Sequence, residues 1–92
     1  MTTATSSKTE IVGPLREILS RVTNGRIKAE QVSESANVFD DLGVTSLELL
    51  ELRFEIETQW NVTIDDQDVG NMQTVGDVID LIAARTAGRK AG

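Results

Sequence analysis

The stretch "DDLGVTSLELLELRFEIE", from Asp40 to Glu57 of this 92-residue chain, joins a loop to a segment rich in leucine. The second half alternates apolar residues with charges, a pattern that a strand also shows. Leucine and glutamate, however, favour helices, and no β-branched residue lies between Ser46 and Ile56. The apolar series also runs from Leu47 to Trp60, which is long for one strand. The stretch therefore predicts a helix that Thr45 or Ser46 can cap.

Two sets of apolar residues lie on nearly opposite sides of this helix. At about 100° per residue, each set gathers on its own side of a helical wheel, and charged residues fill the gaps. A helix with two apolar sides is either enclosed in a core or presents one side to a partner. The first set is Leu49, Leu52, Ile56 and Trp60, and the second is Leu47, Leu50 and Phe54.

A first helix precedes this segment. The apolar residues of 11–22 recur on one side, after capping-box spacing at Ser7–Glu10. Proline is tolerated in a first turn but breaks a helix interior, so Pro14 predicts a helix that either begins near this stripe or bends there. Asn24–Gly25 should end it. Residues 25–45 then form a long loop, which we expect four side chains to pin to the core: Val32, Val38, Phe39 and Leu42.

The last third of the chain predicts one short and one longer helix. Asn61 should end the second helix, and residues 65–72 can form one or two helical turns. Thr74 and Asp77 have capping-box spacing before a final apolar stripe that reaches Ile82. We predict an all-α fold, a small four-helix bundle with three main helices, one short helix, and a long loop between helices 1 and 2. The domain should span residues 8–86, between a disordered tail at 1–7 and a flexible tail at 87–92.

Composition excludes several kinds of chemistry. The chain has no cysteine and no histidine, so disulfides, thiolate or imidazole metal ligands and histidine-dependent catalysis are not available. Residues 30–80 contain thirteen acids and one base, a net charge of 1 − 13 = −12 within a chain of net charge −6. Such a field disfavours nucleic acid and anionic membranes and favours basic partner surfaces. Without an apolar signal core at the N-terminus, the default location is cytoplasmic.

Two acidic groups suggest active or metal sites only superficially. Residues 65–76 begin like a calcium loop, but position 5 is Val69 and position 12 is Gly76, where a glutamate is needed. An acidic loop or a helix cap explains them better. The glutamates at positions 48, 51 and 55 share one helix face and fit a solvated surface better than an acid/base pair. We therefore predict no metal site and no catalytic residue, and thus no enzyme.

The junction Leu42-Gly43-Val44-Thr45-Ser46-Leu47 carries a family resemblance. It resembles the acyl carrier proteins, in which this junction reads Leu-Gly-hydrophobic-Asp-Ser-Leu and the serine bears a 4′-phosphopantetheine arm. The likeness continues through Trp60, where these carriers usually have Phe, and through "TVGDVIDLI" from Thr74 to Ile82. The short motif alone occurs by chance, whereas the match from Ser46 to Ile82 runs without a gap.

The resemblance implies a non-catalytic carrier and a set of partners. Ser46 would hold covalent 4′-phosphopantetheine, attached by a phosphopantetheinyl transferase, and the thiol of the arm would hold acyl groups as thioesters. The second helix is the main docking surface in this family, so the first apolar set is assigned to the core and the second to the surface. Docking would then involve eight residues: Leu47, Glu48, Leu50, Glu51, Phe54, Glu55, Asp40 and Asp41. The expected partners are acyltransferase, ketosynthase or acyl-activating enzymes with basic surfaces, and the carrier should be a monomer.

One departure from the family pattern bears on the pathway. The family's aspartate before the serine is Thr45 here, which can cap the helix but offers no charge. Threonine at this position is familiar in stand-alone carriers of secondary metabolism, which favours polyketide or related specialised biosynthesis. A housekeeping fatty-acid carrier and an aminoacyl or peptidyl carrier are the alternatives, although the latter often have Gly-Gly-His/Asp-Ser at this junction. A helical adaptor without an arm would also explain the acidity and the exposed patch.

Overall fold

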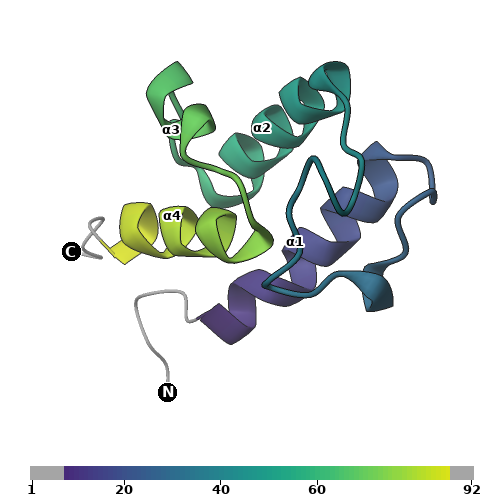
Figure 1. The fold of residues 1–92 in the computed structure, drawn as a ribbon. Helices are drawn as coiled ribbons and strands as arrows, with labels where there is room; N and C mark the ends of the chain where they lie inside the picture. The colour runs from purple at the N-terminus through teal and green to yellow at the C-terminus, as the bar shows by residue number, and fades with distance from the viewer. Residues whose placement is uncertain (1–7, 88–92) are drawn as a thin grey trace.

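Four α-helices and one 3-10 turn make up the regular structure of residues 8–87, the part of the chain that this computed structural model describes (Figure 1). The elements are α1 (Lys8–Val22), η1 (Ala29–Gln31), α2 (Ser46–Trp60), α3 (Asp66–Gly70) and α4 (Val75–Ala87). The predicted all-α bundle of three main helices and one short helix is confirmed. The expected tails lie outside the described residues, except that Ala87 ends α4.

The α1 helix begins earlier than the apolar stripe alone indicated. It starts at Lys8, so Pro14 lies inside the helix, where its ring removes one backbone donor. Ser7, the expected cap, lies outside the described residues. The predicted end is confirmed, because the helix ends at Val22 and, after Thr23, Asn24 and Gly25 both adopt a positive φ, at 55° and 82°. This left-handed geometry satisfies the last helical carbonyls: the N–H of Gly25 donates to Ser20 O over 2.8 Å.

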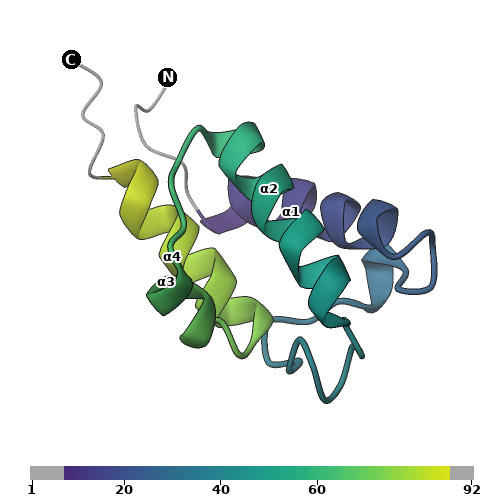
Figure 2. The same cartoon turned by 90° about the horizontal axis from the view of Figure 1, so that it is seen from above.

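The core lies where α1 packs against both α2 and α4 (Figure 1, Figure 2). On α2, Leu52 and Ile56 are fully buried, while Leu49 and Trp60 are half-buried against the same core. The inward side of α2 is therefore the set that the sequence assigned to the core. The remaining buried apolar residues are Ile11, Leu15, Ile18, Leu19, Ile27, Val32, Val38, Val44, Ile64, Met72, Val75, Val78, Ile79 and Ile82.

Backbone hydrogen bonds to the start of α4 order the long loop between α1 and α2. The N–H of Val38 donates to Gln73 O, and the N–H groups of Val75 and Gly76 donate back to the loop, to Ala36 O and Glu34 O. A side chain at Gly76 would place its Cβ 3.2 Å from Glu34 O, so a glycine allows this close approach. The loop is thus a fixed connection that positions the entry to α2.

The structure corrects one predicted anchor of this loop. Val32 and Val38 are buried and Leu42 is partly buried, as expected, but the side chain of Phe39 is exposed. Val38 and Phe39 are neighbours in the chain, and the backbone that points Val38 into the core turns Phe39 outwards. Two residues that the sequence did not single out, Ile27 and Val44, take core positions at the two ends of the loop.

Polar contacts hold α3 to the rest of the molecule. Arg85 of α4 donates to Thr63 O over 2.6 Å and to an Asp68 carboxylate oxygen over 2.7 Å. Arg53 of α2 lies 3.1 Å from an Asp66 carboxylate oxygen and 3.9 Å from one of Glu57. No helix in the described residues is long and apolar enough to cross a membrane.

Candidate functional site

Ser46 is the first residue of α2, and its side chain is exposed. Its hydroxyl makes no hydrogen bond to any described residue. The adjacent N–H groups of the first helical turn have no partner within the helix and carry a partial positive charge. An exposed, unbonded hydroxyl at such a position is sterically open to an enzyme, and a phosphate ester formed on it would be an anion that the helix end favours by about 0.3–1 kcal/mol.

Thr45, and not Ser46, caps α2. The Thr45 hydroxyl accepts from the N–H of Glu48 over 3.1 Å, and the Thr45 N–H donates to the Glu48 carboxylate over 3.0 Å. These two bonds form a complete capping box. The sequence left open which of the two hydroxyls caps the helix. Because Thr45 does so, the hydroxyl of Ser46 is not needed for the fold.

Arg26 ties the loop before Ser46 to the first turn of α2. Its guanidinium donates to Leu42 O over 3.2 Å and also pairs with the Glu48 carboxylate. Between these contacts, Gly43 has a φ of 67°, which a residue with a side chain rarely adopts. A Cβ there would also lie 3.4 Å from the Arg26 guanidinium. Residues 42–48 are therefore held in one arrangement around Ser46.

The hydrogen bond from Arg26 is the largest cause that lowers the pKa of Glu48 below its usual value, and the hydrogen bond from the Thr45 N–H adds to it. Glu48 therefore remains charged at neutral pH. Sequence reasoning missed this pairing, because Arg26 and Glu48 are 22 residues apart. An arginine directly after a helix-ending Asn-Gly turn was the only available signal.

The second apolar set of α2 is exposed, as the resemblance implied. Leu47, Leu50 and Phe54 expose 66%, 59% and 66% of their surface. A single exposed leucine or phenylalanine is ordinary on a protein surface. Three on one helix, beginning next to Ser46, form a patch of the kind that marks a binding surface. We call these three residues the apolar patch.

The acidic residues around the apolar patch are not equivalent. Glu48 pairs with Arg26, and Glu55 pairs with Arg21 of α1 over 2.8 Å. Asp41 accepts from the N–H of Asn37 over 2.7 Å and so helps to fold the loop. Asp40 is exposed in the same loop. Glu51 is also exposed and makes no ion pair with any described residue.

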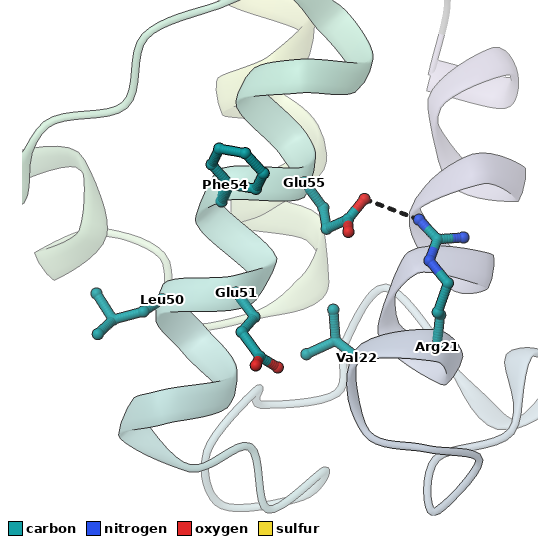
Figure 3. A pocket seen from close by; sticks show the side chains of 6 residues that line it. All are labelled: Arg21, Val22, Leu50, Glu51, Phe54 and Glu55. Atoms are coloured by element: carbon teal, nitrogen blue, oxygen red, sulfur yellow. Dashed lines mark hydrogen bonds and ion pairs between the residues drawn. The ribbon is translucent and has the colours of Figure 1, made fainter.

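An open groove joins the apolar patch to the end of α1 (Figure 3). It has a volume of about 440 Å³ and is lined by Arg21 and Val22 from α1 and by Leu50, Glu51, Phe54 and Glu55 from α2. In the figure, Glu51 and Glu55 turn towards α1, and the ion pair from Arg21 to Glu55 spans the two helices. The sequence did not predict this groove, because it depends on how the two helices cross.

The acidic segment before α3 has a structural role. Asp65 and Asp68 form a capping box, with the N–H of Asp68 donating to Asp65 over 2.8 Å. The hydrogen bond from the Asp65 N–H, followed by that from Arg85, lowers the pKa of Asp68. Within residues 8–87, no group of three or more His, Cys, Asp or Glu side chains is placed to hold a metal ion.

Comparisons with known proteins agree with this geometry. The family model described as phosphopantetheine attachment site matches residues 14–82. The chain is 35% identical to the acyl carrier protein of Thermotoga maritima over 77 residues, which cover 84% of this chain and 93% of that protein. It is 39% identical to the acyl carrier protein of Acidothermus cellulolyticus over 80 residues, 87% of this chain and 93% of the other. It is also 35% identical to the meromycolate extension acyl carrier protein of Mycolicibacterium aurum, over 84% of this chain and 77% of that one.

A solved structure shares the fold as well. The acyl carrier protein of Enterococcus faecalis superposes with a TM-score of 0.71 at 29% sequence identity, covering 86% of this chain and 98% of that one. The family match and these relatives therefore identify the protein family, and the open start of α2 is suited to the phosphate ester that the family carries. The chain belongs to the acyl carrier protein family, whose members are not enzymes but carry acyl groups on covalently attached 4′-phosphopantetheine.

Proposed function

We propose that Ser46 is the residue that carries the 4′-phosphopantetheine arm, and that the carrier serves polyketide or related specialised biosynthesis. The observation that supports the site is the exposed hydroxyl of Ser46, which makes no hydrogen bond to a described residue and begins α2. The thiol of the arm supplies the acyl chemistry that a chain without cysteine lacks. The protein's own residues present the serine, hold the loop and receive the partner enzymes.

Co-expression with a broad-specificity phosphopantetheinyl transferase tests the site. Intact mass spectrometry of the wild-type chain should show the addition of one phosphopantetheine, and the Ser46→Ala variant should show none. Ser35→Ala is a matched control, because Ser35 is also an exposed serine but lies in the long loop, and it should be modified like the wild type. Equal modification of Ser46→Ala and the wild type would refute the assignment.

The apolar patch and the surrounding carboxylates form the proposed docking face. Leu47, Leu50 and Phe54 would be covered by a partner enzyme, with Glu48, Glu51, Glu55, Asp40 and Asp41 around them. Complementary charge speeds encounter more than it raises final affinity, which suits a carrier that must release each partner. The partners we propose are the transferase and the acyltransferase, ketosynthase or acyl-activating enzymes of the pathway. Action as a monomer in the cytoplasm stays a prediction.

The proposal of a specialised pathway rests on Thr45, because threonine at this position is familiar in stand-alone carriers of secondary metabolism. Thr45 caps the helix as the family's aspartate would, through its two bonds with Glu48, but it has no charge. The identity of the acyl group tests this pathway. The holo-protein should be isolated from its native host and the mass of its thioester measured. Ketide or short dicarboxylic acyl groups would support the proposal, whereas saturated long-chain acyl groups or aminoacyl groups would overturn it.

Fatty-acid biosynthesis is the second candidate, and the relatives favour it. The proteins from Thermotoga maritima and Acidothermus cellulolyticus are named simply acyl carrier protein, and the one from Mycolicibacterium aurum serves meromycolate extension. A strain whose own fatty-acid carrier can be switched off separates the candidates. If this chain restores growth of that strain, the fatty-acid role is supported. If the chain is phosphopantetheinylated in that strain but does not restore growth, the specialised role is supported.

A further inference from the structure

The groove between α1 and α2 offers a partner an apolar surface beside one available carboxylate. Val22 at the end of α1 and Leu50 and Phe54 on α2 supply the apolar lining. The two acidic residues of the groove differ in one respect. Glu55 already holds Arg21 at 2.8 Å, whereas Glu51 pairs with no described residue.

This difference in pairing limits what the groove can bind. A partner cation that approaches Glu55 must displace Arg21, and it is also repelled by the Arg21 guanidinium. A cation that approaches Glu51 displaces nothing among the described residues. The groove is thus complementary to one apolar side chain with one adjacent lysine or arginine, and not to a surface with several cations. Its lining continues from the apolar patch, with which it shares Leu50 and Phe54.

We propose that this groove extends the docking face onto α1 and receives such an apolar side chain and its neighbouring cation from the phosphopantetheinyl transferase. The partner's cation pairs with Glu51. Arg21 determines specificity, because its ion pair with Glu55 keeps that carboxylate from pairing with a second cation of the partner. This inference rests on the proposed function, because it requires Ser46 to be the residue that the transferase modifies. A rise of about 1.5 Å per helical residue places the groove residues of α2 within a few turns of Ser46, so an enzyme that reaches the serine covers them.

The test is the rate at which the transferase modifies the apo-protein, followed by intact mass at several salt concentrations. Glu51→Gln should raise KM by roughly two- to five-fold, the equivalent of one exposed ion pair, and should weaken its dependence on salt. Arg21→Gln should act in the opposite direction, because it frees Glu55 and removes a competing cation, so KM should fall and depend more steeply on salt. A merely structural role of Arg21 would not lower KM.

Three further variants complete the design. The double variant Arg21→Gln/Glu51→Gln should return KM towards the wild-type value, since Glu55 then replaces the lost carboxylate. Val22→Ser should raise KM without changing the salt dependence, because it removes only apolar contact. Glu17→Gln is the matched control, an exposed glutamate of α1 outside the groove, and should behave like the wild type. Thermal unfolding of each variant checks that the fold is retained.

The outcomes separate this inference from the proposed function. If the wild-type chain takes up no phosphopantetheine at Ser46, the proposed function fails and the inference fails with it. If Ser46 is modified but the groove variants all match the wild type, only the inference fails. It also fails if the variants change self-association in sedimentation, which would assign the groove to a second copy. If the groove variants differ from the wild type only in the acylated holo-protein, the groove binds the acyl chain, and the inference is likewise overturned.

Discussion

Glu48 is held at the start of α2 from two directions. It accepts the N–H of Thr45, which completes the helix cap, and it pairs with Arg26 from the loop after α1. Both contacts favour the charged carboxylate, and they lower its pKa in the folded protein. Glu48, which the resemblance placed on the docking face, thus also joins three segments around Ser46.

This lowered pKa predicts how stability depends on pH. A folded-state pKa below the unfolded value, about 4.3 for glutamate, means that the unfolded chain binds the proton more readily between the two pKa values. The contribution of Glu48 to stability is therefore fully present at neutral pH and is lost as the pH falls below about 4.3 and through the folded-state pKa. Urea unfolding of the wild type and of Glu48→Gln should show a stability difference at pH 7 that shrinks as the solution becomes acidic.

The comparison with Glu48→Gln is needed because acidification also relieves repulsion in a chain of net charge −6. That second effect acts on both proteins and cancels in the difference. A difference in stability that stays constant from pH 7 into the acidic range would contradict the role given to the Glu48 carboxylate. Glu34→Gln, at an exposed loop position, serves as a control with the same change of charge.

The α2 helix carries two apolar faces with different roles. Ile56 on the inner face is fully buried, and Leu50 on the outer face exposes 59% of its surface. We expect Ile56→Ala to lower the free energy of unfolding by about 2–5 kcal/mol, because it leaves a cavity in the core. Leu50→Ser should change it by no more than about 0.5 kcal/mol. Denaturant unfolding measures both, and a large loss of stability in Leu50→Ser would show that this face is not free.

The short α3 helix depends on side-chain contacts from its neighbours. Its five residues cannot form a stable helix alone, and Arg85 joins it to α4 through Thr63 O and Asp68. Arg85→Gln should therefore speed amide hydrogen exchange in residues 62–72, by an amount equivalent to about 1 kcal/mol. The core amides of α1 should change less.

Arg53→Gln is the matched control for α3, because the Asp66 side chain that Arg53 contacts is fully exposed. An exposed pair contributes little, so this variant should exchange nearly as slowly as the wild type. Equal acceleration in both variants would mean that Arg85 has no special part in holding α3.

Patterns local in sequence predicted the helices and their order well. The helical spacing of α2 separated its buried from its exposed residues, and Asn61 ends that helix in the left-handed conformation that an asparagine tolerates. The capping-box spacing of Thr74 and Asp77 predicted the start of α4, and both of its hydrogen bonds are present. These features depend only on residues within a few positions of one another, which is why one sequence suffices.

What the sequence could not predict depends on contacts between distant residues. The ion pairs of Arg21 and Arg26 join residues 34 and 22 positions apart, so the acidic face of α2 is partly neutralised in a way that a helical wheel cannot show. The sequence predicted only a long loop over residues 25–45, because the loop's order comes from hydrogen bonds to residues 73–76. Phe39 was misplaced for the same reason, since only the tertiary structure decides which of two adjacent apolar residues faces the core.

Whether Ser46 bears the arm can be measured by locating the modification on the protein from its native host. Tryptic cleavage after Lys28 and Arg53 releases residues 29–53, a peptide with three serines at positions 33, 35 and 46. Tandem mass spectrometry of this peptide assigns the modified residue directly. We predict phosphopantetheine on Ser46 alone. Phosphopantetheine on Ser33 or Ser35, or a peptide that is never modified, would contradict the account.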